Sequence, residues 1–469
     1  MSRQIANFGL SRLLIISALL ALTVLILSSK YFVLAAIPSL AILATLVMSK
    51  RPQIGVYILI FMIPFGAFRK IMVGSTEINL AWLVAGGTFL IFLADRIIHK
   101  KSFRDLRNLV SLWLGLFFLI AIVSTWLSPH IAASIKDFKL WIAALLYIIL
   151  VLALVPKQGF RKTVPKLIII SVAISTFLGN IDYLFGLSLF TEDHMGGDLT
   201  RNVGATIDPN NLSLMIIASM PIIMHGFLYA KRPISKLAYA MLLANAVLGI
   251  GLTFSRGGFL VFVVVSALIA FEFRHFFKVK FIGFILLGIS VSLSAFVIIM
   301  PDTFWQRQTS LTSWEDSSLV RRASYLEVAS DAFLERPLFG HGLDSFYQIY
   351  AQTQYAKIDK ETGKILGRYA HNSYLEILVG TGIIGLIAFL MLLFTALKAF
   401  TIAKQRYLMA NMKEEADFIA CLRLFLFATL FYLLIFSETH HKFMLVGLAL
   451  SQLALRYSQI DLIENKKNG

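Results

Sequence analysis

Long apolar stretches follow one another along almost the whole chain, and short polar segments separate them. A helix needs about 20 predominantly apolar residues to cross the hydrocarbon core of a bilayer, so each stretch predicts a transmembrane helix. The pattern predicts an all-α polytopic membrane protein with about 14 (12–14) transmembrane helices, the lower counts applying if short segments among the first three are re-entrant or interfacial. The first stretch follows Arg3 and Arg12 as in a signal peptide, but no small-x-small cleavage site comes after it, so we interpret it as the first span. The predicted spans are residues 13–28, 31–48, 53–68, 80–98, 109–127, 138–155, 164–185, 211–230, 233–253, 257–273, 279–300, 373–399, 417–437 and 441–458.

One polar segment is much longer than the others. It divides the chain into residues 1–300 with transmembrane helices 1–11, the loop 301–370, and residues 371–469 with helices 12–14 and a tail. Within the loop, residues 319–333 place apolar side chains at helical spacing, which predicts an amphipathic helix that ends before Pro337. Long connections usually carry function or are disordered, so polar chemistry is expected in this loop.

The charged residues indicate how the chain lies in the membrane. Only 15% of the residues are charged and 58% are hydrophobic, yet the formal net charge is +17. The basic residues form short clusters between apolar runs, which favours control of topology over nucleic-acid binding. Roughly 26 of the 43 Lys and Arg residues lie near the termini or in alternate loops, against about 8 in the short loops opposite. The positive-inside rule then predicts that both termini are cytoplasmic.

With that orientation, the loops on the other side face outward. They are residues 186–210, 254–258, 301–371 and 437–442. The most conspicuous polar motifs of the chain fall in these loops, so the sequence predicts that they share one external site. The single cysteine, Cys421, excludes an intramolecular disulfide and is expected to pack in the membrane.

Two arginines are candidates for binding an anion. Arg201 precedes Asp208-Pro209, which is typical of a helix start with Asp as N-cap and Pro at the first position. The amides and the positive dipole end of that helix would favour an anion such as a phosphate beside Arg201. Arg256 lies at a second outward turn before Gly257-Gly258, and its planar guanidinium suits phosphate. The alternatives are that Asp208 only caps, and that the arginines only solvate a loop or the interface.

His371 is the candidate catalytic base. It precedes a helix that runs inward from Asn372, and the positive end of the helix dipole favours a neutral imidazole that can accept a proton. A role as a helix cap or an interfacial histidine is the alternative. Glu376 lies one turn further into the apolar run, where an unpaired carboxylate is costly, so we expect a basic partner or polar surroundings, in a supporting or a catalytic role.

Weaker candidates lie nearby. Arg321 and Arg322 on the predicted amphipathic helix are possible further contacts to phosphate or acceptor, and His341 in a Gly-His-Gly turn is a possible ligand or hydrogen-bond donor, as are His440 and His441. Solubility and turn formation explain these residues equally well. The acidic pairs lack the ligand spacing of a divalent-cation site, so neither a metal nor another cofactor is expected.

These motifs resemble the O-antigen ligase and O-antigen polymerase family of bacterial membrane glycosyltransferases. The resemblance is carried by Arg201-x-x-Gly-x-x-x-Asp-Pro-Asn, Thr-Phe-Ser-Arg256-Gly-Gly, and Gly340-x-Gly342 followed by His371-Asn-x-Tyr-Leu-Glu. It implies an inverting, metal-independent glycosyltransferase of polysaccharide or lipopolysaccharide biosynthesis in the bacterial inner (plasma) membrane. Its active site would be periplasmic, with Arg201 and Arg256 on the carrier diphosphate and His371 as base on the acceptor hydroxyl.

The implied partners are an undecaprenyl-diphosphate-linked glycan as donor, lipid A core or a growing glycan as acceptor, and membrane lipids, with no nucleic acid. Whether the enzyme ligates finished chains or polymerises repeat units, as in O-antigen or exopolysaccharide synthesis, stays open. A polysaccharide or lipid transporter or flippase is the alternative from another class, but transporter sites lie near the bilayer midplane rather than at one surface. A membrane scaffold would leave the basic, histidine-bearing outer face unexplained.

Overall fold

The computed structural model describes residues 46–68, 70–73, 76–187, 189–193, 200–276, 305, 317–358, 363 and 365–468. The predicted spans 13–28 and 279–300, and nearly all of 31–48, lie outside the described residues.

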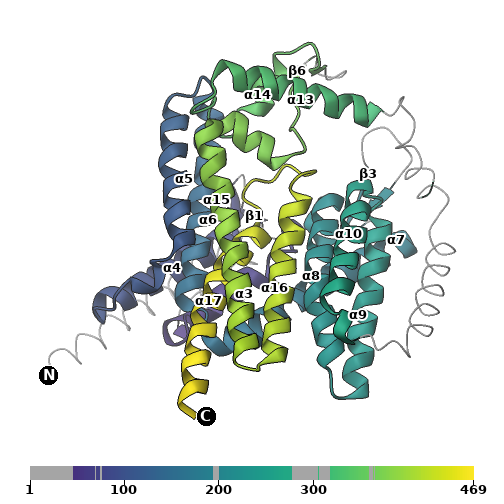
Figure 1. The fold of residues 1–469 in the computed structure, drawn as a ribbon. Coiled ribbons are helices and arrows are strands. Elements are labelled where there is room, and N and C mark those ends of the chain that lie inside the picture. The colour runs from purple at the N-terminus through teal and green to yellow at the C-terminus, as the bar shows by residue number, and fades with distance from the viewer. Residues whose placement is uncertain are drawn as a thin grey trace, which may run out of the picture.

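The described chain folds into a helical bundle with three short antiparallel hairpins in its connections (Figure 1). The helices are α3 (Gln53–Phe61), α4 (Leu80–Ile98), α5 (Leu109–Trp126), α6 (Ile131–Leu154), α7 (Val164–Phe185), α8 (Pro209–Tyr229), α9 (Pro233–Leu252), α10 (Arg256–Glu272), α13 (Ser317–Glu335), α14 (Phe346–Ala351), α15 (Ser373–Met409), α16 (Lys413–Tyr432) and α17 (Lys442–Asn468). The strands are β1 (Lys70–Val73), β2 (Thr76–Asn79), β3 (Thr191–Asp193), β4 (Thr200–Asn202), β5 (Lys357–Ile358) and β6 (Ile365–Leu366).

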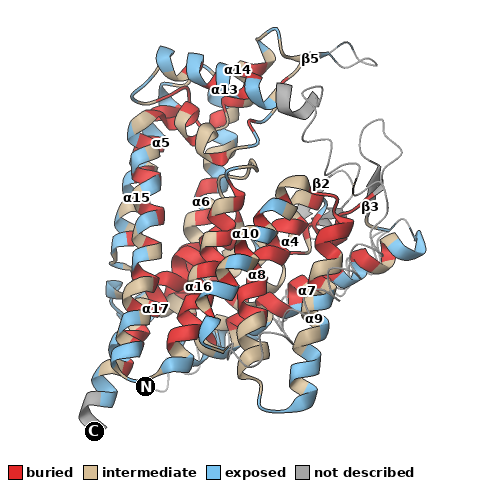
Figure 2. Cartoon of the chain, turned by 45° about the vertical axis from the view of Figure 1, so that its right-hand side comes forward, coloured by how far each residue is buried: buried red, intermediate tan, exposed pale blue. Residues whose placement is uncertain are grey.

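The core of the bundle is formed by α8, α15, α16 and α17. Helix α16 packs against α8 on one side and against α15 and α17 on the other, and most of its side chains are buried. Buried residues concentrate in the middle of the bundle in Figure 2. Helix α4 is less buried than the other helices of membrane-spanning length, with Thr88 and Phe92 as its buried residues. An apolar surface left open in this way is expected of a helix that faces lipid.

Among the described residues, seven helices are long and apolar enough to cross a membrane, namely α4, α5, α6, α7 with the turn before it, α8, α9 and α15. This confirms an all-α membrane protein. The total of fourteen spans stays a prediction, as does the division at residues 300 and 370. Helix α10 has 17 residues and was predicted as a span, and helices α16 and α17 occupy the positions of the last two predicted spans.

Several predicted spans have other boundaries. Helices α15 and α17, for example, each continue ten residues beyond the predicted ends at 399 and 458. The segment 53–68 is not one long helix, because α3 ends at Phe61 and a short 3-10 turn follows at Gly66–Phe68. Helix α6 begins at Ile131, seven residues before the predicted start. The predicted start was too late because the first three turns of the helix hold Lys136, Asp137 and Lys139. Hydropathy alone discards such a polar beginning, although the backbone hydrogen bonds continue through it.

Helix α15 is broken near its start. Gly382 has φ 65° and ψ −171°, a conformation open essentially to glycine only. The turn after α13 fills the break, since Ile383 N donates to Pro337 O at 2.8 Å and Gly342 N donates to Gly380 O at 2.9 Å. A Cβ atom on Gly382 would collide with the Leu338 carbonyl. The break and the turn therefore form one backbone unit.

The amphipathic helix predicted within 301–370 is present as α13, and it ends before Pro337 as expected. Figure 1 shows α13 and α14 across the end of the bundle opposite the C-terminus. A small separate core of Tyr325, Val328, Phe346, Tyr350 and Val379 fixes this layer to the first turns of α15.

Candidate functional site

Helices α8, α10, α15 and α17 begin at the same end of the bundle. The Ser255 hydroxyl, which caps α10, donates to Asn210 Oδ1 in the first turn of α8 at 2.9 Å. His441 Nε2, just before α17, lies 3.0 Å from Asn211 Oδ1 in the same turn. The start of α15 joins them through Ser373, whose backbone N–H donates to Leu433 O after α16 at 2.9 Å. Several positive helix ends therefore meet beneath α13, which favours a negatively charged ligand.

Asp208 has the predicted local role. It is the N-cap of α8, and its Oδ1 accepts from the backbone N–H groups of Asn210 and Asn211, both at 2.8 Å. Pro209 is the first helical residue. The structure thus confirms the predicted helix start. The Asp208 side chain is half-buried where the helix ends converge.

Tyr432, at the end of α16, packs against the Arg256 motif. Its hydroxyl oxygen lies 3.2 Å from Ser255 Oγ, and its side chain is 1% exposed. Sequence reasoning missed this residue because a tyrosine in an apolar helix carries no signal of its neighbours. The hydrogen bond between Ser255 and Asn210 was also missed, because the sequence does not show which helix starts become neighbours.

Arg201 is held in place from the end of α9. It lies in β4, its side chain is 8% exposed, and its Nε donates to the Thr253 carbonyl at 2.9 Å. Thr253 stands three residues before Arg256, so this bond joins the Arg201 motif directly to the Arg256 motif.

Buried asparagines lock the strand that carries Arg201. Asn202 Nδ2 donates to Asn180 Oδ1 at 2.8 Å, and Asn180 Nδ2 donates to Asn245 Oδ1 at 3.0 Å. Asn202 Oδ1 also accepts from the Gly204 N–H at 2.8 Å. A chain of three amides from α7, β4 and α9 thus fixes the backbone beside Arg201.

Replacing Asn180 with leucine should therefore damage both stability and the site. The change leaves the amides of Asn202 and Asn245 without their partner, which costs about 1–3 kcal/mol of unfolding free energy for each buried group. We expect a lower thermal unfolding midpoint and weaker binding of an anionic lipid by the purified protein. Asn465→Leu, at an exposed amide near the end of α17, is the matched control. An unchanged midpoint in Asn180→Leu would contradict the locking role.

Arg256 is the first residue of α10 and is half-buried. The two glycines after it allow close helix packing, because a Cβ atom on Gly257 would collide with Ile435 and one on Gly258 with Ser213. The space beside these glycines is therefore occupied by Ile435, which follows α16, and by Ser213 of α8. Close packing explains the Gly-Gly pair and fixes the direction in which α10 leaves the site.

His371 lies immediately before the N-cap of α15, with φ 48°. It is solvent-exposed, and its ring centroid is 6.0 Å from that of Tyr325 on α13. Partial desolvation lowers the pKa of the imidazole below 6.5, and Arg322, Arg368 and Arg321 lower it further, whereas Asp208 raises it. The imidazole is therefore within electrostatic range of the start of α8 and is neutral at pH 7, as a general base requires.

Arg321 and Arg322 thus lie on the side of α13 that influences His371. Arg368, which also influences Tyr325, was missed because nothing in the polar stretch before it marks its position. Together the three arginines and His371 form a basic layer over the helix ends.

Two further candidates, His341 and Glu376, have structural partners close to the site. His341 is 3% exposed, and its Nε2 is 2.8 Å from the Ala332 carbonyl, so it fastens the turn after α13 to that helix. Glu376 accepts from the Ser437 hydroxyl at 2.6 Å and from the Ala370 N–H at 3.0 Å. Glu376 therefore lies in polar surroundings, which was one of the two expectations for this residue. Its bond to Ala370 also holds the residue directly before His371. Among the described residues, no group of three or more His, Cys, Asp or Glu side chains is arranged to hold a metal ion.

Comparison with known proteins bears on the family of the chain. The model of the O-antigen ligase family matches residues 214–390, a region that includes the Arg256 motif, α13 and His371, which confirms the predicted resemblance to that family. An uncharacterised protein of Haemophilus influenzae is 26% identical over 198 residues, which is 40% of this chain and 49% of the relative. The chain thus matches about half the length of that relative.

Proposed function

We propose that this multi-pass protein transfers glycan from an undecaprenyl-diphosphate carrier to an acceptor hydroxyl at the periplasmic face of the bacterial inner membrane. Its family supports a membrane ligase or polymerase of glycans. The observation that carries the finer proposal is the connection of Arg201, Arg256 and His371 through the converging ends of α8, α10 and α15.

In this reaction the acceptor oxygen attacks the anomeric carbon of the donor sugar. The bond from that carbon to the diphosphate oxygen breaks, and the electron pair leaves with the diphosphate. His371 takes the proton of the acceptor hydroxyl, while Arg201 and Arg256 stabilise the charge that grows on the leaving group. Attack opposite the leaving group inverts the anomeric carbon, and no step calls for a metal ion.

The buried position of Arg201 supports the role on the diphosphate. A guanidinium held by a backbone carbonyl keeps its direction before the substrate arrives, and preorganised charge stabilises a transition state better than mobile charge does. A flippase would instead be expected to hold its polar site near the bilayer midplane.

Reconstitution tests the proposal. Purified protein in proteoliposomes is given an undecaprenyl-diphosphate glycan and candidate acceptors, with and without EDTA. We expect glycan transfer that is insensitive to EDTA, with inversion at the newly formed bond measured by NMR. Transport of the glycolipid without formation of a glycosidic bond would contradict the enzyme and favour the flippase.

The choice between ligase and polymerase needs a second measurement, the glycan profile of a null strain. Accumulation of carrier-linked polymer with loss of long chains on lipid A indicates a ligase. Accumulation of single repeat units indicates a polymerase.

A further inference from the structure

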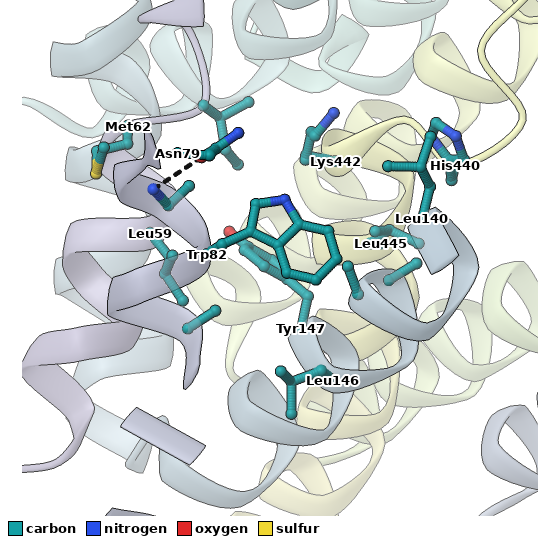
Figure 3. Close-up of a pocket in the computed structure, with 15 residues that line it drawn as sticks. Leu59, Met62, Asn79, Trp82, Leu140, Leu146, Tyr147, His440, Lys442 and Leu445 are labelled. Carbon is teal, nitrogen blue, oxygen red and sulfur yellow. Dashed lines mark hydrogen bonds between the residues drawn. The ribbon is translucent and has the colours of Figure 1, made fainter. Parts of the chain in front are cut away.

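A second site lies beside the start of α17 and does not include the Arg201 or Arg256 motif in its lining. It begins as an apolar groove of about 180 Å³ between α3, α4, α6 and α17. Figure 3 shows the Trp82 indole across this groove, above Tyr147 and below Lys442. Trp82 is 47% exposed although it is large and apolar, and α4 buries little of its surface in the bundle. The groove therefore opens where α4 faces lipid.

A polar pocket adjoins the groove. The second cavity, also of about 180 Å³, is lined by both Leu140 and His440, which line the groove as well. Its walls come from α6, the turn at Leu343-Asp344, the start of α15 and the turn before α17. The carboxylates of Asp137, Asp344, Glu376 and Glu438 and the ring of Tyr369 contribute to its lining. An apolar groove and a carboxylate-lined pocket thus lie next to each other on the two sides of Leu140 and His440.

The polar end is suited to hydroxyl groups and not to a diphosphate. His440 Nε2 lies 3.2 Å from Asp137 Oδ1, and Lys442 Nζ donates to Glu438 Oε1 at 3.3 Å. Burial would raise the pKa of Glu438, but Lys442, His441 and His440 outweigh burial and lower it to about 2. Lys442 and the two histidines are therefore engaged by carboxylates of the protein. Lys136 also lines the pocket, but it shares the lining with four carboxylates, whose combined negative charge would repel a phosphate.

Carboxylates instead accept strong hydrogen bonds from sugar hydroxyls. Burial and nearby Asp137 raise the pKa of Asp344 to about 6, so it is mostly ionised at pH 7 and can accept such bonds. Tyr369 adds an aromatic face to the polar pocket. Its side chain is 45% exposed, and its ring centroid lies 5.3 Å from that of Tyr347.

The pocket adjoins the proposed base. Glu376 lines the pocket and also accepts from the N–H of Ala370, the residue before His371. A hydroxyl bound in the pocket would thus be separated from the His371 backbone by Glu376 and Ala370.

We propose that the groove and the pocket together bind the acceptor amphiphile, with its hydrocarbon chain along Trp82 and its sugar hydroxyls among the carboxylates. This inference rests on the proposed glycan transfer, since it assigns the second substrate of that reaction. The donor would then bind beside Arg201 and Arg256, and the two lipids would occupy separate sites.

Direct binding to the full chain in nanodiscs tests the site without reference to activity. The probes are a fluorescent glucosyl diacylglycerol, which has a neutral hydroxylated headgroup, and undecaprenyl diphosphate. Ala85→Trp fills the groove from α4. Leu83→Trp, at a residue of the same helix that is 60% exposed and does not line the groove, is the matched control. Asp344→Asn changes the polar end while conserving shape.

We expect Ala85→Trp to weaken binding of the glucosyl diacylglycerol about tenfold, because the chain loses buried apolar contact, and Leu83→Trp to have no effect. Asp344→Asn should weaken the same probe by about threefold to tenfold. Undecaprenyl diphosphate should bind all three variants as it binds the unmodified protein.

Other results overturn the inference. If Ala85→Trp behaves like Leu83→Trp, the groove holds no acceptor chain. If Ala85→Trp weakens undecaprenyl diphosphate instead, the groove belongs to the carrier lipid. Failure of the proposed function would give a different pattern. Arg201→Ala would then leave the binding of undecaprenyl diphosphate intact, while Ala85→Trp would still weaken the binding of the glucosyl diacylglycerol.

Discussion

Replacing Arg201 with alanine is expected to reduce glycan transfer by about 10²–10³-fold, the usual cost of removing one preorganised donor from a developing anion. The loss should be in kcat as well as in donor affinity, because the diphosphate carries more charge in the transition state than in the bound donor. Arg201→Lys should not restore activity. The guanidinium is directed by its Nε–H bond to the Thr253 carbonyl, and an ammonium group cannot make that bond while presenting a planar fork.

The measurement is the rate of transfer of radiolabelled glycan in proteoliposomes, with membrane insertion checked in parallel. Arg232→Ala removes an exposed guanidinium just before α9, at the end of that helix remote from Thr253, and should leave the rate unchanged. Arg256→Ala is expected to behave like Arg201→Ala. Full activity in Arg201→Ala, Arg256→Ala and His371→Ala would refute the assignment of this site.

His371→Gln is expected to lower the rate by about 10²–10⁴-fold at pH 7, the usual contribution of a general base. Because desolvation and the three arginines lower the pKa of His371, the imidazole is neutral at pH 7. The rate of the unmodified enzyme should therefore be flat near neutrality and should fall only as the pH drops through the lowered pKa.

Two substitutions near His371 should shift, in opposite directions, the pH at which the rate falls on the acid side of the profile, here called the acid limb. Arg322→Gln removes a cation, so it raises the pKa and moves the limb to higher pH. Asp208→Asn removes an anion while keeping an N-cap side chain, so it lowers the pKa and moves the limb to lower pH. A pH profile of kcat that is identical in all three proteins would exclude His371 as the titrating base.

Local chemistry made several elements predictable. Asp208-Pro209 specifies a helix start whatever surrounds it, and α13 follows from apolar spacing that ends before Pro337. The gathering of the Arg201, Arg256 and His371 motifs at one end of the bundle was predicted from the alternation of basic loops, since helices that cross a membrane in turn return every second loop to the same side. Which membrane face this is stays a prediction.

The contacts within the site could not be predicted in the same way. The amide chain from Asn180 to Asn245, the Tyr432 hydroxyl beside Ser255 and the position of Arg368 depend on which helices become neighbours, and hydropathy does not specify helix neighbours. The carboxylate pocket shows the same limit, because Asp137, Asp344 and Glu438 come from three separate segments and none carries a motif.

The break at Gly382 makes the segment after α13 part of the membrane domain itself. An unbroken helix of 37 residues would be about 55 Å long, well beyond the hydrocarbon thickness of about 30 Å. An interrupted backbone within a bilayer is tolerated only where other protein groups cover it, and residues 337–342 provide that cover. A deletion between Pro337 and Gly342 would therefore expose peptide groups at the break in α15.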